Sequence, residues 1–97
     1  MISRIEEDLT VAIRLVGSLR GISGRCRISL KLADATPLVI VLKEVVETLP
    51  SLRQPLADPR SNTLVLVNGK EISVLKGLET PVKDGDEVVL VPVLHGG

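Results

Sequence analysis

The apolar run Val88 to Val93 constrains the fold of this chain more than any other stretch. Successive residues of a β-strand point to opposite faces of a sheet, so a strand of this composition presents apolar side chains on both sides. Such a strand is typical of the middle of a sheet. The polar turn Asp84-Gly85-Asp86 precedes it, and we expect the strand to cover residues 87–93.

Four further strands are predicted, at residues 9–15, 26–32, 63–67 and 70–73. The residues of the first two that alternate toward the core are Leu9, Val11, Ile13, Leu15, Cys26, Ile28, Leu30 and Leu32. Cys26 is therefore expected to be a buried structural thiol. The glycine-rich segment 17–24 is expected to be a turn or flexible loop that closes the first hairpin. Asn68-Gly69 predicts a two-residue turn that closes the second.

One main helix is predicted over residues 37–49, with Thr36 as its cap and Pro37 at its first position. Pro50 should end it. The side expected to face the sheet carries Leu38, Leu42, Val45, Val46 and Leu49. The proline-rich segment 50–62 is expected to be a stiff connection with room for one short helical turn, and residues 74–82 should cross back over the sheet.

The order of these elements predicts an α+β fold, in which a mixed sheet of about five strands packs on one main helix. The first and last strands should lie centrally and parallel, because both are long and the last is apolar on both faces. We expect a single domain over residues 1–94 and a flexible tail over residues 95–97.

Composition excludes several classes of function. The 97 residues include no aromatic residue, which removes the stacking platforms of single-stranded nucleic-acid binders. Twelve basic residues balance twelve acidic ones, which argues against a reader of phosphate backbones. One cysteine, no signal peptide and no apolar run long enough for a membrane span predict a cytoplasmic protein without membrane contact. His95 lacks ligating partners, so no metal site is expected.

The pair Gly96-Gly97 suggests a reactive tail. Glycines cannot pack and have the greatest backbone freedom, so they present a carboxylate on a thin, flexible leash. We interpret the Gly97 carboxylate as a group that threads into the active site of a partner. His95 could orient this tail, or could simply be solvated. Surface lysines could accept a second copy of the chain, although solvated charge is the simpler interpretation for all five (Lys31, Lys43, Lys70, Lys76 and Lys83).

Leu78, the turn and strand start Asp84 to Val88, and the terminal Gly96-Gly97 together resemble a known family. They are similar to the ubiquitin-like β-grasp sulfur carriers: the small subunit of molybdopterin synthase, the sulfur carrier of thiazole synthesis, the ubiquitin-related modifier and the small archaeal modifier proteins. Pro92-Val93 is similar to the molybdopterin synthase subunit, but Leu90 and Val91 replace its aromatic residues. The ending Leu94 to Gly97 looks like the ubiquitin-related modifier.

The resemblance implies that an ATP-dependent, ubiquitin-activating-type enzyme adenylates the Gly97 carboxylate. The product would become a thiocarboxylate for sulfur transfer, or an amide bond to a lysine of a target protein. Two alternatives are the small subunit of molybdopterin synthase and a plain β-grasp interaction module. As a sulfur carrier and modifier, or as the synthase subunit, the chain is expected to be a carrier and co-substrate and not an enzyme. It is expected to bind no cofactor, because the partner uses the ATP.

The apolar strand also predicts a docking surface. Only one face of the sheet can lie on the helix, so part of the other must present apolar side chains to solvent. We expect Val89 and Val91 to face outward and, with Val93 and Leu94, to dock the activating enzyme, while Gly96 and His95 thread the tail. The chain is expected to be a monomer; closure of a homodimer by this face is the alternative.

Overall fold

The computed structural model describes residues 9–32, 35–57 and 63–93. In chain order the elements are β1 (Leu9–Leu15), α1 (Ser18–Ser23), β2 (Arg27–Leu32), β3 (Thr36–Pro37), α2 (Leu38–Thr48), η2 (Pro50–Leu52), α3 (Arg53–Ala57), β4 (Thr63–Val67), β5 (Lys70–Glu71), η3 (Ile72–Val74), η4 (Gly77–Glu79), β6 (Pro81–Val82) and β7 (Glu87–Pro92).

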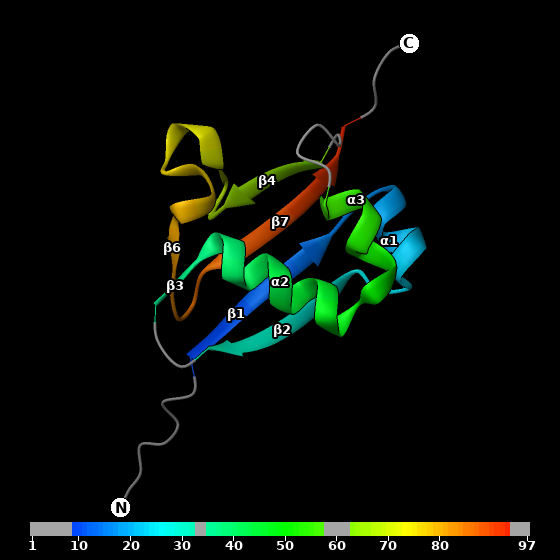
Figure 1. Ribbon diagram of the computed structural model, residues 1–97, viewed down its shortest axis with the longest axis horizontal. Helices are drawn as coiled ribbons and strands as arrows, with labels where there is room; N and C mark the ends of the chain where they lie inside the picture. The colour runs from blue at the N-terminus through cyan, green and yellow to red at the C-terminus, as the bar shows by residue number, and fades with distance from the viewer. Residues whose placement is uncertain (1–8, 33–34, 58–62, 94–97) are drawn as a thin grey trace, which may run out of the picture.

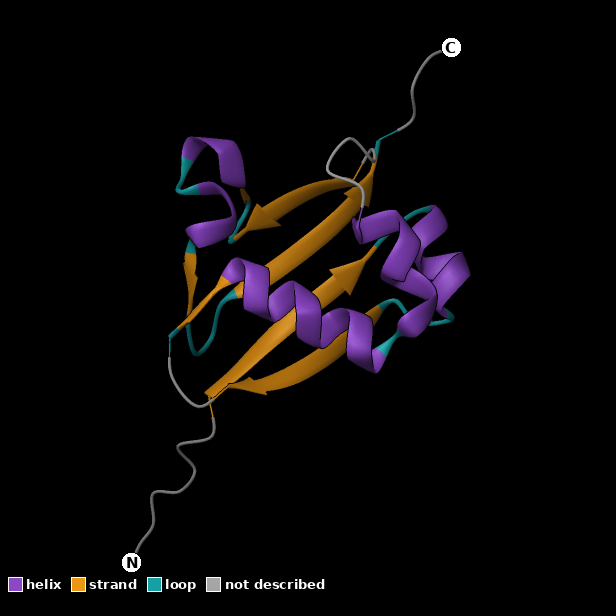
Figure 2. Cartoon of the chain, viewed as in Figure 1, coloured by secondary structure: helices purple, strands orange, loops and turns teal. Residues whose placement is uncertain are grey.

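Five strands form one mixed sheet in the order β2-β1-β7-β4-β5. β1 and β7 pair in parallel, and the other neighbours pair antiparallel. The prediction that the first and last long strands lie centrally and parallel is therefore confirmed. The main helix α2 crosses one face of this sheet, and the short helices α1 and α3 lie beyond its C-terminal end (Figures 1 and 2). β3 and β6 form a separate two-stranded ladder beside the start of α2.

The described core is built from leucine, isoleucine and valine, as the absence of aromatic residues requires. Leu38, Val41 and Val45 of α2 are fully buried against the sheet. The predicted sheet-facing side included Val46 and left out Val41. In the structure Val46 is only half-buried, because the helix is rotated so that Val41 faces the sheet. The other buried side chains are Val11, Ile13, Leu15, Leu19, Ile28, Leu30, Leu32, Leu52, Val65, Val67, Val82, Val88 and Leu90.

Residues 17–24 are not the loop that their glycines predicted. Residues 18–23 form α1, and Leu19 on this helix is only 2% exposed. Two glycines flank the helix instead of disrupting it. Gly17 is required at its start, because its φ is 59° and a Cβ there would lie 2.9 Å from Cγ of Pro92. Burial of Leu19 therefore outweighs the weak helix propensity of this short segment.

The start of α2 also differs from the prediction. Pro37 is the N-cap, with no side-chain cap hydrogen bond, and Thr36 lies in β3, paired with Val82 of β6. Thr36 is therefore not the cap. The Leu38 N–H donates instead to the carbonyl oxygen of Thr80, 2.9 Å away. A backbone group distant in sequence thus satisfies one of the free N–H groups of the first helical turn.

Cys26 is exposed, so the prediction of a buried thiol is wrong. β2 begins at Arg27, and the predicted alternation holds only from Ile28 onward. Cys26 precedes the strand, where its carbonyl oxygen accepts a hydrogen bond from the Leu15 N–H at 2.9 Å. Alternation predicts the side to which a residue points, but it does not say whether another element covers that side.

The second hairpin is confirmed at its turn. Asn68 and Gly69 have φ values of 52° and 83°, the positive values that a type I′ turn requires. β5 is shorter than predicted, since residues 72–74 form a 3₁₀ turn in place of a strand. Residues 50–62 contain more helix than the one short turn predicted there, since η2 and α3 follow each other over residues 50–57.

Candidate functional site

The candidate site is centred on β7, whose side chains divide between the two faces of the sheet. Val88 and Leu90 are fully buried on the side of α2. Val89 and Val91 alternate with them and are half-buried on the opposite face. The predicted outward register of Val89 and Val91 is therefore confirmed.

Two leucines of β4 extend this outward surface. In the antiparallel pairing of β4 with β7, Leu64 lies opposite Val91 and Leu66 lies opposite Val89. Both leucines are half-buried, whereas their neighbours Val65 and Val67 belong to the core. We refer to Leu64, Leu66, Val89 and Val91 as the valine–leucine face. The strand pairing makes these four residues neighbours. They lie on the side of the sheet opposite α2, which covers one face (Figure 2), and apolar surfaces of this kind mark interaction sites on small proteins.

The polar turn before β7 fixes where the strand begins. Asp84 Oδ1 accepts a hydrogen bond of 2.8 Å from the Thr10 N–H, and Asp86 Oδ2 accepts one of 2.8 Å from the Lys83 N–H. Asp86 is only 7% exposed, and its Oδ1 accepts a further bond of 3.0 Å from the Asn68 side-chain amide. The turn is thereby tied to both β1 and the β4–β5 hairpin.

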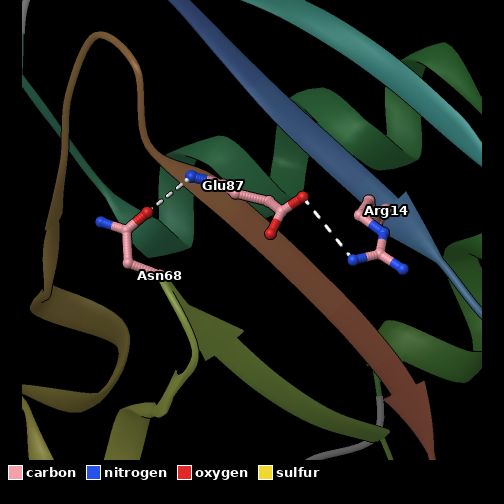
Figure 3. Close-up of polar contacts among 3 residues, drawn as sticks. All are labelled: Arg14, Asn68 and Glu87. Carbon is pink, nitrogen blue, oxygen red and sulfur yellow. Dashed lines mark hydrogen bonds and ion pairs between the residues drawn. The ribbon is translucent and has the colours of Figure 1, made fainter.

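Asn68 also holds the first residue of β7, as Figure 3 shows. Its side-chain oxygen accepts a hydrogen bond of 2.9 Å from the Glu87 N–H. The Glu87 carboxylate lies 3.8 Å from the Arg14 guanidinium across the parallel pair. These contacts set the register of β7 against both of its neighbours, and therefore determine which of its side chains face outward.

At its other end, β7 leads to the predicted tail. Pro92 packs against Gly17 at the start of α1, and Val93 is 42% exposed. Leu94, His95, Gly96 and Gly97 lie outside the described residues. The structure thus brings Val89, Val91 and Val93 together on β7 and just beyond it, and leaves the roles of the four tail residues as predictions.

Sequence reasoning missed a groove on the far side of α2. Its volume is about 460 Å³, and it is lined by apolar and charged side chains: Val39, Leu42, Val46, Leu56, Leu78, Lys43, Glu47 and Arg53. The sequence does hint at this groove, because α2 carries more apolar residues than the single stripe that faces the sheet can hold. Leu78, singled out above as part of the family motif, is 50% exposed beside this groove.

Two features of the described residues bear on the class of site. Within residues 9–32, 35–57 and 63–93, no three histidine, cysteine, aspartate or glutamate side chains gather as metal ligands would. None of the helices in the same segments has the length and apolar content to cross a membrane.

A model of a known protein family, the ThiS family, matches residues 13–97 of this chain. A candidate sulfur carrier protein of Archaeoglobus fulgidus is 48% identical over 33 residues. That match covers 34% of this chain and 38% of the relative, so the similarity spans well under half the length of either.

Solved structures share the whole fold. Small archaeal modifier protein 1 of Methanosarcina acetivorans superposes with a TM-score of 0.74 at 28% identity, over 93% of this chain and 98% of that one. Urm1 of Trypanosoma brucei superposes with a TM-score of 0.76 at 22% identity, over 93% of this chain and 97% of that one. A third similar chain comes from the complex of subunits 1 and 2 of the molybdopterin-converting factor of Helicobacter pylori. It superposes with a TM-score of 0.61 at 22% identity, over 92% of this chain and 100% of that one. These neighbours identify the fold as the ubiquitin-like β-grasp.

Proposed function

This chain belongs to the ThiS family, and on that premise we propose that it is a sulfur carrier and small protein modifier whose Gly97 carboxylate is the reacting group. One observation carries the proposal: the family match extends from β1 through Gly97, so it includes the diglycine as well as the fold. A free carboxylate is a poor electrophile, so its use as a carrier group requires activation by a partner.

The proposed chemistry has two steps, both on a partner enzyme. A carboxylate oxygen of Gly97 attacks the α-phosphorus of ATP, pyrophosphate leaves, and an acyl-adenylate forms. A hydrosulfide ion delivered by the partner then attacks the carbonyl carbon, AMP leaves, the S–H proton passes to solvent, and Gly97 becomes a thiocarboxylate. In the modifier role a lysine amine attacks in place of sulfur, loses a proton and forms an amide. The chain supplies the carboxylate and the partner supplies the catalysis.

The valine–leucine face supports this proposal as a docking surface. It lies on β7, the strand that leads to the tail, and the partner must hold the domain while the tail reaches its active site. Apolar side chains at the centre of an interface contribute most of the binding free energy. Docking through Val89 and Val91, with Val93 and Leu94 at its margin, would align Gly96 and His95 for threading.

A second candidate function is the small subunit of a molybdopterin synthase. The similarity to a chain in the two-subunit complex of the Helicobacter pylori molybdopterin-converting factor favours it. In that role the thiocarboxylate of Gly97 would enter a larger sulfur-accepting subunit, and no lysine conjugates would form.

Removal of Gly96 and Gly97 tests the main proposal. The truncated chain should fail to support ATP–pyrophosphate exchange by the activating enzyme, because it lacks the carboxylate in the required position. The free energy of unfolding should change by no more than a few tenths of a kcal/mol, as for other positions outside the core. Exchange at the rate of the full chain would contradict the proposal.

Mass spectrometry of the protein from its native cells separates the two candidate functions. A thiocarboxylate, in which one terminal oxygen is replaced by sulfur, is expected under both. Amide conjugates between Gly97 and lysines of other proteins are expected only for the modifier. Thiocarboxylate without conjugates would favour the synthase subunit.

A further inference from the structure

The positive charges of this chain are concentrated in the β1–α1–β2 hairpin. Residues 9–32 contain five basic residues and no acidic one. The other seven basic residues and all twelve acidic residues lie elsewhere in the sequence, so a chain of zero net charge carries one strongly basic segment. We refer to Arg14, Arg20, Arg25 and Arg27, all of them exposed, as the arginine surface.

The structure brings three of these arginines, Arg14, Arg20 and Arg27, close together. Arg14 and Arg27 are direct cross-strand partners in the antiparallel pairing of β1 with β2. Arg14, Arg20 and Arg27 also line one hollow of about 340 Å³, together with Cys26 and residues 15–17. Like charges directly opposite one another destabilise a strand pair. The hairpin therefore carries an electrostatic cost that an acidic partner would offset.

Within residues 9–32, 35–57 and 63–93, few acidic side chains lie close to the arginine surface. Among the described residues, Arg14 is the one member of the arginine surface with an acidic partner, Glu87 at 3.8 Å. Both of these side chains are substantially exposed, at 48% and 36%. Exposed pairs of this kind contribute little to folding stability, so the stability of the domain gives no reason for these exposed arginines.

The arginine surface is continuous with the valine–leucine face. In the parallel pairing of β1 with β7, Arg14 lies beside Val89. α1, which carries Arg20, contacts β7, and Gly17 before α1 lies against Pro92, the last residue of β7. One side of the sheet thus runs from an apolar area on β4 and β7 to a basic area on β1 and β2.

We propose that the arginine surface is the second half of the docking site and pairs with a carboxylate-rich surface of the activating enzyme. This inference rests on the proposed function. A protein partner fits better than a nucleic acid, because the adjoining face is aliphatic and the chain has no aromatic residue on which bases could stack. Arginine forks match carboxylates in geometry, and complementary charge accelerates association and orients the partners.

The test compares two double variants with the same change of charge. Arg25→Glu/Arg27→Glu alters the arginine surface, and Lys70→Glu/Lys76→Glu alters exposed positions on β5 and beside η4, at the other edge of the sheet. ATP–pyrophosphate exchange is measured against carrier concentration at low and high salt. The arginine variant should raise KM for the carrier about tenfold or more, with kcat unchanged and a weaker dependence on salt. The lysine variant should stay within about twofold of the wild type.

The melting temperature of the arginine variant serves as the control for folding. Arg27→Glu places a carboxylate opposite Arg14 and Arg25 is exposed, so the melting temperature of the double variant should not fall. A raised KM in a chain of undiminished stability supports the proposal, because a merely structural role would lower both together. Equal effects of the two double variants, or normal exchange by the arginine variant, would overturn it.

Two further outcomes are distinguishable. If the wild-type chain supports no exchange at all, the proposed function fails and this inference fails with it. If exchange is normal in the arginine variant but its binding to a fluorescent single-stranded RNA of random sequence is lost, the surface serves a nucleic acid and the proposal is wrong.

Discussion

Leu90 and Val91 are adjacent in the sequence but lie on opposite faces of the same strand. Leu90 is fully buried on the side of α2, whereas Val91 is half-buried beside Leu64 on the open face. A substitution at Val91 should therefore act on docking, and one at Leu90 on folding. This contrast between neighbours allows binding and stability to be measured separately.

Val91→Asp should weaken activation by about tenfold or more, equivalent to about 1.4 kcal/mol, because it puts a charge into an apolar docking surface. The chain should stay folded and monomeric. Leu90→Ala is the matched control and should cost about 2–5 kcal/mol of stability through lost burial. ATP–pyrophosphate exchange and chemical denaturation measure the two effects. Normal activation of a folded Val91→Asp chain would exclude docking through this face.

The exposed side chain of Cys26 adds little to the core. Cys26→Ala should change the free energy of unfolding by no more than about 0.5 kcal/mol, since the residue contributes to the fold mainly through its carbonyl oxygen. Sulfur transfer should survive. If transfer is lost while thermal stability is unchanged, Cys26 is a relay thiol.

Among the elements, the β4–β5 hairpin does more than connect two strands. Its turn residue Asn68 bonds to Asp86 and to the Glu87 N–H, and its own N–H donates to the Glu87 carbonyl oxygen at 2.8 Å. The hairpin thus aligns the start of β7. Because β7 pairs with β1 on its other side, an error in its register would disturb both halves of the sheet.

Two substitutions at Asn68 separate the backbone and side-chain contributions. Asn68→Gly keeps the positive φ of 52° accessible and loses only the side-chain hydrogen bonds, so it should cost about 1–2 kcal/mol. Asn68→Ala should cost about 1 kcal/mol more, since alanine disfavours that conformation. Urea denaturation measures both. Equal losses for the two variants would mean that backbone conformation is unimportant at this turn.

At the scale of the whole molecule, one aliphatic core joins every major element. The buried side chains of β1, β2, β4, β7, α1 and α2 form a single cluster, to which Leu42, Leu49, Leu56 and Ile72 add partial cover. No division between two cores exists among the described residues. Helix, hairpins and central strands should therefore lose their structure together.

Calorimetry should detect a single unfolding transition with equal calorimetric and van't Hoff enthalpies. For a chain of 97 residues the enthalpy should be about 60–70 kcal/mol at roughly 60 °C. Far-ultraviolet circular dichroism should give the same midpoint; the chain has no tryptophan or tyrosine for fluorescence. Two resolved transitions, or midpoints that differ between the methods, would show that the hairpin or α2 unfolds independently.

The sequence alone determined the features that depend on short-range chemistry. Alternation placed Val11 and Ile13 on the core face and put Val88 and Leu90 on the face opposite Val89 and Val91, because adjacent strand residues must point to opposite faces; burial of the even pair came from packing against α2. Asn68-Gly69 determined the second turn, because few other residue pairs accept its dihedral angles. The order of the elements and the two-sided apolar strand then predicted the central parallel pair.

Tertiary structure decided whatever depends on contacts between distant segments. Thr36 pairs with β6 instead of capping α2, because the Thr80 carbonyl already accepts the helical N–H. Residues 18–23 form a helix because Leu19 can be buried, and Cys26 is exposed because β2 begins only at the next residue. The arginines gather because strand pairing brings Arg14 and Arg27 together. A local pattern fixes the direction of a side chain, but only the folded chain determines what lies against it.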